Sequence, residues 1–174
     1  MAKINCVLNA RFLAARETPH FEEKKIKKRQ NHWDGSYWYN ESTWLVNKKT
    51  QEQVLCVSSY DEPDHCTQCC GIDELDFRDF GRIIDDEENP IYKHDYFDEL
   101  VAKMVDMQCS HKDQRVLFVG LPTSIGEYSD YSIVVYEKIR KILKSFGFIE
   151  LCPEPYKNNN SGNFITVLAG QMPE

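Results

Sequence analysis

The chain has 174 residues, of which 41% are apolar and 12% aromatic, and its formal charge is −7. This composition excludes a disordered chain, and the length fits one domain that buries a substantial core. No segment approaches the ~20 apolar residues that a membrane-spanning helix requires. We therefore expect a single cytoplasmic domain, residues 1–174, that does not contact a membrane.

The first third of the chain predicts strands on either side of a basic segment. Residues 3–14 alternate loosely between apolar and polar and favour a strand. Residues 20–35 hold five basic residues around one isoleucine, a pattern typical of a short exposed helix or a flexible arm. Residues 36–60 are rich in aromatic and β-branched residues around a polar turn, and they predict a hairpin whose packed face carries Trp38, Tyr39 and Trp44.

The remainder of the chain predicts strands that alternate with helices. A short strand is expected at 69–77, a helix after Asp95, and a strand buried on both faces at 115–122. A second helix should end at Gly147, which favours a left-handed stop, and two strands joined by KNNNSG should follow. We therefore predict an α+β fold with a single mixed sheet, a central hairpin and two packed helices.

This order of elements resembles the GNAT acetyltransferase superfamily from about residue 36 onwards. CCGIDELDF is similar to the strand that contacts acetyl-CoA, and YEKIRKILKSFGF resembles the helix that ends in Gly-Phe before the final strand. The resemblance implies the scaffold, and it implies N-acetyl transfer from acetyl-CoA with Tyr131 or Tyr136 as general acid. The expected cofactor turn diverges, because Ile83 replaces its second small residue and four acidic residues follow.

A cluster of cysteines and histidines suggests a structural zinc site. Cys66 and Cys69 have the spacing of a zinc knuckle, and Cys109 and His111 lie just before the buried strand. If the strands near Cys70 and Arg115 are parallel neighbours, both pairs fall at the same end of the sheet. The alternative is that these cysteines are ordinary interior residues, and His65 and Cys70 are substitute ligands. One structural zinc, or no cofactor, is expected.

The acidic residues predict a function in binding. Residues 61–88 contain eleven acidic residues and two arginines, a net charge of −9, which leaves about +2 for the rest of the chain. We expect this surface to bind a basic protein, as a non-enzymatic regulatory or inhibitory protein does, including one encoded by a virus. The residues expected to make this contact are Asp79, Asp85, Asp86, Glu87 and Glu88.

Two alternatives remain open at this stage. One is the N-acetyltransferase that the resemblance implies. The other is a zinc-stapled nucleic-acid binder, in which Lys24–Arg29 contact phosphates and Trp33, Tyr37 and Trp38 stack on bases. The overall negative charge counts against nucleic acid as the ligand.

Overall fold

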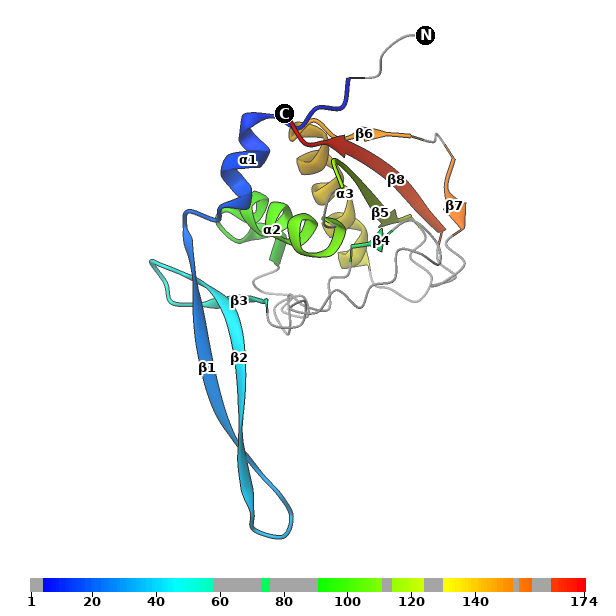
Figure 1. The fold of residues 1–174 in the computed structure, drawn as a ribbon. Coiled ribbons are helices and arrows are strands. Elements are labelled where there is room, and N and C mark those ends of the chain that lie inside the picture. Colours follow the sequence, from blue (N-terminus) through cyan, green and yellow to red (C-terminus); the bar gives the residue numbers. More distant parts are fainter. Residues whose placement is uncertain are drawn as a thin grey trace.

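The computed structural model describes residues 5–57, 73–75, 91–110, 114–123, 130–151, 154–157 and 164–174. In this part of the chain the fold is mixed α+β, with two sheets instead of the single sheet expected (Figure 1). The helices are α1 (Ala10–Arg16), α2 (Phe97–Cys109) and α3 (Asp130–Ser145), and a single 3-10 turn, η4 (Ile91–Lys93), precedes α2.

The larger sheet has the strand order β4-β5-β8-β6, with β7 also pairing with β8. Its strands are β4 (Asp73–Glu74), β5 (Val116–Pro122), β6 (Ile149–Glu150), β7 (Tyr156–Lys157) and β8 (Phe164–Gln171). The expected parallel pair is present, since β4 runs parallel to β5, whereas β8 is antiparallel to β5, β6 and β7. β8 lies in the interior of the sheet, and accordingly Ile165–Gly170 are buried.

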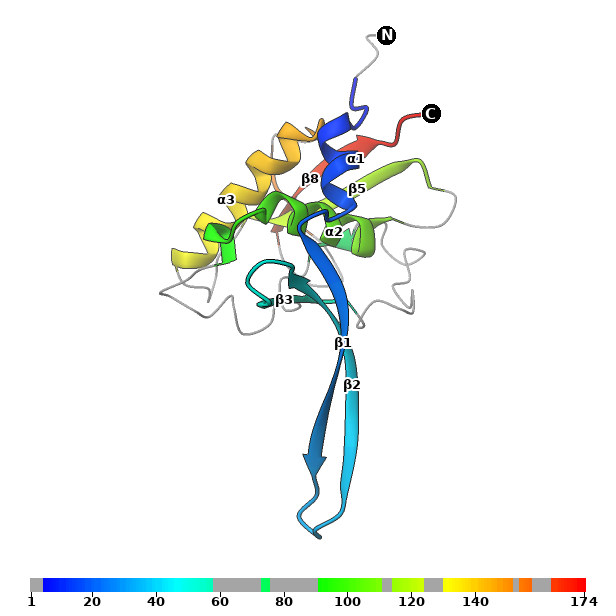
Figure 2. The ribbon, with the colours of Figure 1, turned by 90° about the vertical axis from the view of Figure 1, so that its left-hand side faces the viewer.

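The helices lie together on one side of this sheet (Figures 1 and 2). Helix α2 carries buried residues around most of its circumference because α1 and α3 also pack against it. Helix α3 ends as predicted, with Gly147 at a φ of +105° and the Phe148 amide donating to the Leu143 carbonyl. The helices predicted after Asp95 and before Gly147, and the buried strand β5, are therefore confirmed.

The N-terminal residues form a helix where a strand was expected. Asn9 begins α1, because its side-chain oxygen accepts a hydrogen bond of 3.2 Å from the Phe12 amide. The alanines and leucine of ARFLAAR favour a helix, and Phe12 and Ala15 face the core. Among the described residues of this segment, Val7 alone pairs in the manner of a strand, with Gln171 at the end of β8.

The smaller sheet is antiparallel, with the order β1-β2-β3. Its strands are β1 (Phe21–Asn31), β2 (Tyr37–Asn47) and β3 (Gln53–Cys56). The predicted hairpin is present as β2 and β3, but β3 pairs only with Trp44–Val46, whereas β1 pairs with β2 over its whole length. The basic segment is thus a strand, since it finds a complete partner in the aromatic and β-branched residues of β2.

The β1–β2 hairpin projects away from the body of the protein, as both views show. Eleven residue pairs at ~3.4 Å per residue give a ribbon about 34 Å long. Phe21 and Leu45 at its root belong to the main hydrophobic core, together with Val54 and Leu55 of β3. The root therefore fixes a ribbon whose outer part extends into solvent.

Arg140 and Lys144 of α3 hold the short strand β6 by ion pairs to Glu150, with 3.1 Å between Lys144 Nζ and Glu150 Oε1. The hydrogen bond from Arg140, reinforced by the one from Lys144, lowers the pKa of Glu150 from 4.5 to about 2. A carboxyl group with a lowered pKa stabilises the folded state above its unfolded pKa. That contribution is lost as the pH falls from about 4.5 towards 2.

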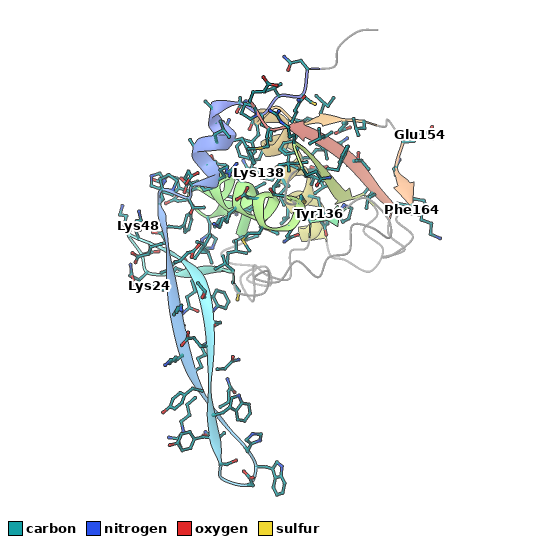
Figure 3. All side chains as sticks on the ribbon, viewed as in Figure 1. Lys24, Lys48, Tyr136, Lys138, Glu154 and Phe164 are labelled. Atoms are coloured by element: carbon teal, nitrogen blue, oxygen red, sulfur yellow. The ribbon has the colours of Figure 1, made fainter. Side chains whose placement is uncertain are left out.

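We expect Glu150→Gln to lower the free energy of unfolding at pH 7 by about 1 kcal/mol, since solvent screens this partly exposed pair. Urea unfolding at pH 7 and at pH 2.5 checks this, and the difference between variant and wild type should be much smaller at the lower pH, because most of the stabilisation is lost between pH 4.5 and pH 2.5. Glu154→Gln is the control, because Glu154 is exposed and has no ion-pair partner among the described residues (Figure 3). A difference that is the same at both pH values would contradict the prediction.

Candidate nucleic-acid interface

The outer half of the β1–β2 hairpin is exposed on both faces. Within the described residues, no third strand pairs with β2 beyond Thr43, and Tyr37–Glu41 are all exposed. Residues 24–41 contain five basic and two acidic residues, a net charge of +3. Side chains stand out on both sides of the ribbon in Figure 3. The outer half of the hairpin thus presents positive charge and aromatic rings to solvent.

One face of the hairpin combines cations with tyrosines. The register places Lys25, Lys27 and Arg29 on the same face as Tyr37 and Tyr39. The guanidinium carbon of Arg29 lies 4.0 Å from the centre of the Tyr37 ring. The rings of Tyr37 and Tyr39 meet edge to face, with centroids 5.9 Å apart, and both remain more than half exposed. Two flat rings and three cations therefore share a single strip.

The acidic residues of the hairpin neutralise this charge only in part. Glu41 lies 3.8 Å from Lys25 Nζ and 3.7 Å from Lys27 Nζ, and its single charge is shared between the two lysines. Lys28 and Arg29 make no ion pair in the described part of the chain. Their charge is available to an anionic ligand.

The opposite face carries a second aromatic pair. Lys24, Lys28 and Trp38 lie on this face, and the rings of His32 and Trp38 are 4.1 Å apart between centroids. Trp38 is 45% exposed, whereas Trp44, nearer the root, is partly buried. The expectation that Trp38 and Tyr39 form a packed face is therefore wrong. They lie beyond the part of β2 that pairs with β3, and their side chains are on opposite faces of the ribbon.

A tight turn at the end of the hairpin presents Trp33 to solvent. The Gly35 amide donates to the His32 carbonyl at 3.1 Å, and Gly35 has a φ of +87°, which glycine adopts readily. Asp34 accepts hydrogen bonds from the amide and hydroxyl of Ser36 at 2.9 and 2.6 Å, which lower the pKa of its carboxyl group. Trp33 is 99% exposed. The turn is held by its own hydrogen bonds, and the indole is free to contact a ligand.

A buried carboxylate anchors the root of the hairpin to α2. Glu99, which is 5% exposed, accepts a hydrogen bond of 3.2 Å from the His20 amide, and its Oε1 lies 2.5 Å from His20 Nδ1. The Tyr96 ring stacks on the His20 ring with centroids 3.4 Å apart. Lys48, after β2, donates to the Pro19 carbonyl at 2.9 Å. The start of β1 is thereby fixed to α2, and the end of β2 is joined to the residue that precedes His20.

The site residues expected from the cysteines and acids fall mostly outside the described residues. Of the predicted zinc ligands, only Cys109 is described, and it is buried in the main hydrophobic core at the end of α2. Cys66, Cys69 and His111 lie outside the described residues, as do the five acidic residues Asp79, Asp85, Asp86, Glu87 and Glu88. Among the residues that the structure does describe, no group of three potential metal ligands gathers.

The sequence predicted the residues of this hairpin only in part. Lys24–Arg29, Trp33, Tyr37 and Trp38 stood out as one alternative interface, but the strand pairing that aligns them and the role of Tyr39 were missed. The missed signal is Asp34-Gly35, a common hairpin turn, between two segments that alternate poorly in hydrophobicity.

Comparison with protein families, with curated proteins and with solved structures found no match. The GNAT-like order is therefore not confirmed by a fold match, and the function has to be inferred from the chain itself. In the described residues, no helix has the length and apolar character needed to cross a membrane.

Proposed function

We propose that this protein binds single-stranded nucleic acid without catalysis, through the outer half of the β1–β2 hairpin. The proposal rests on one observation: Arg29, Tyr37 and Tyr39 share an exposed strip with Lys25 and Lys27. Proteins that bind single strands combine cations that follow the backbone with aromatic rings on which bases stack. This hairpin provides both on one element.

The spacing of the side chains supports an extended strand as ligand. Alternate residues on one face of a strand are about 7 Å apart, a distance similar to that between successive phosphates of an extended single strand. Lys25, Lys27 and Arg29 occupy three such successive positions. Their side chains can therefore contact neighbouring phosphates while the tyrosines stack on bases.

The hairpin and the acidic segment differ in charge along the sequence. Residues 61–88 alone have a charge of −9, whereas the outer hairpin has a charge of +3. Exposed charges separated by more than about 8 Å are largely screened at physiological ionic strength. Among the described residues, the charges closest to a ligand on the outer hairpin are those of the hairpin itself.

The test is fluorescence anisotropy of a labelled single-stranded oligonucleotide over a range of salt concentrations. The affinity should fall with salt, by a log–log slope of about −0.7 for each phosphate contacted. Replacing Lys25 and Lys27 by alanine should make this slope shallower by about 1.4, if each lysine contacts one phosphate. Tyr39→Ala should weaken binding by about 1–3 kcal/mol through lost stacking.

A matched control removes the same charge from the body. Lys138 and Lys141 are exposed on α3, and Lys138 lies over the body of the molecule, far from the end of the hairpin (Figure 3). Their replacement by alanine should leave the salt slope unchanged. The proposal is wrong if both double variants behave alike, or if polyglutamate competes as well as the oligonucleotide does. The latter result would indicate an acidic protein surface as ligand.

A further inference from the structure

The end of the hairpin carries an exposed tryptophan, Trp33, which phosphate binding and stacking along the strands do not require. Trp33 is 99% exposed, although tryptophan is the side chain with the largest apolar surface to bury. No aromatic or cation–π contact involves it in the described residues, whereas His32 and Trp38 pair with each other directly behind it. An indole in this position has no role in the stability of the fold.

Hydrogen bonds fix the backbone of the turn that carries Trp33. The His32 amide donates to the Ser36 carbonyl at 2.8 Å, and Asp34 accepts two hydrogen bonds from Ser36. Gly35 takes the positive φ that closes the turn. Trp33 occupies the first of the two central positions of this turn, at the most distant point of the ribbon. The backbone of Trp33 is therefore preorganised for binding, and it has little conformational entropy to lose when a ligand binds.

The aromatic residues behind the indole lie on both faces of the ribbon. Tyr37 is on one face and Trp38 on the other, so that bases on either side of an inserted indole meet a flat ring. Basic residues follow along β1 on both faces, with Lys25, Lys27 and Arg29 on one face and Lys24 and Lys28 on the other. This arrangement suits a nucleic acid that is opened at one step and continues past the hairpin in both directions.

We infer that Trp33 is a wedge that enters between two neighbouring bases, and that the protein selects sites where bases are already unpaired or easily unstacked. This inference rests on the proposed function and names its preferred ligand: a bulge or a junction between single and double strand. Inserting a side chain into a paired duplex requires the stacked bases to separate. That cost is smallest where pairing is interrupted.

The experiment compares three oligonucleotides: a single strand, a perfect duplex, and a duplex with a two-nucleotide bulge. Each carries 2-aminopurine, whose fluorescence rises when it loses its stacking partner, and the bulged duplex carries it next to the bulge. Wild-type protein should bind the bulged duplex about tenfold more tightly than the perfect one and change its fluorescence. Trp33→Ala should abolish this preference and the fluorescence change, and Trp33→Phe should retain part of both.

The results separate the inference from the function on which it rests. The salt slope should stay the same in Trp33→Ala, because no cation is removed, and urea unfolding should match the wild type, because the indole packs against nothing. If the single strand binds with the expected salt slope but Trp33→Ala keeps the preference for the bulge, Trp33 does not insert between bases. The proposed function then stands without this inference. If none of the three oligonucleotides binds, both are wrong.

Discussion

Replacing Phe12 by alanine is expected to lower the free energy of unfolding by about 3–5 kcal/mol. Phe12 is fully buried, and its ring lies 5.5 Å from that of Phe146 and 6.0 Å from that of Phe148, between centroids. Removing the ring leaves a cavity where α1 meets the end of α3. Urea unfolding monitored by circular dichroism measures the effect.

Phe164→Ala is the matched control for Phe12→Ala. Phe164 is 48% exposed at the start of β8 (Figure 3), so that its replacement should cost about 1 kcal/mol or less. Equal costs for the two variants would mean that α1 is not docked on the end of α3. The contrast therefore tests the position of the N-terminal helix, which the sequence did not predict.

Gly147→Ala is expected to cost about 3 kcal/mol. Gly147 has a φ of +105°, which is strained for any other residue, and an added Cβ would lie 2.7 Å from the backbone carbonyl oxygen of Val7. That oxygen cannot move as the end of a flexible side chain does. Thermal unfolding measures the effect, and Gly147→Asn should be no better, because asparagine tolerates positive φ but carries the same Cβ.

Gly35→Ala provides the comparison for the clash at Gly147. Its φ is +87°, but nothing lies within 4 Å of the added Cβ. Because the hairpin end is exposed, any strain there should leave the unfolding of the body nearly unchanged. If Gly147→Ala were as mild as Gly35→Ala, the N-terminal segment would not lie against the end of α3.

The elements predicted best from the sequence are those whose structure follows from local sequence signals. Helix α3 has an apolar stripe, basic residues near its end and a glycine stop, and β5 is a continuous apolar run, so both were predicted correctly. The expectation of a short exposed helix or a flexible arm at residues 20–35 was wrong, because a lysine-rich strand such as β1 has no alternation to reveal it. Its structure depends on pairing with β2, which local composition does not show.

The candidate interface was also predicted only in part from the sequence. The basic and aromatic residues were recognised by type, since lysine, arginine and tryptophan indicate nucleic-acid binding wherever they cluster. The faces on which these residues lie were not predicted. The face of each residue depends on the register of the two strands, and the turn at Asp34-Gly35 sets that register. A shift of one residue would move Tyr39 to the opposite face from the one it shares with Arg29.

The length of the unsupported ribbon has a consequence for how copies of this protein behave in concentrated solution. Beyond β3, the main-chain amide and carbonyl groups on the outer sides of both strands are open to pairing, a geometry that promotes self-association into aggregates. Lys24, Lys25, Lys27 and Lys28 line one of these edges, so that two copies approaching side by side along β1 repel each other. The lysines that we assign to ligand binding therefore also protect colloidal stability, and neutralising them all should make the protein prone to precipitate.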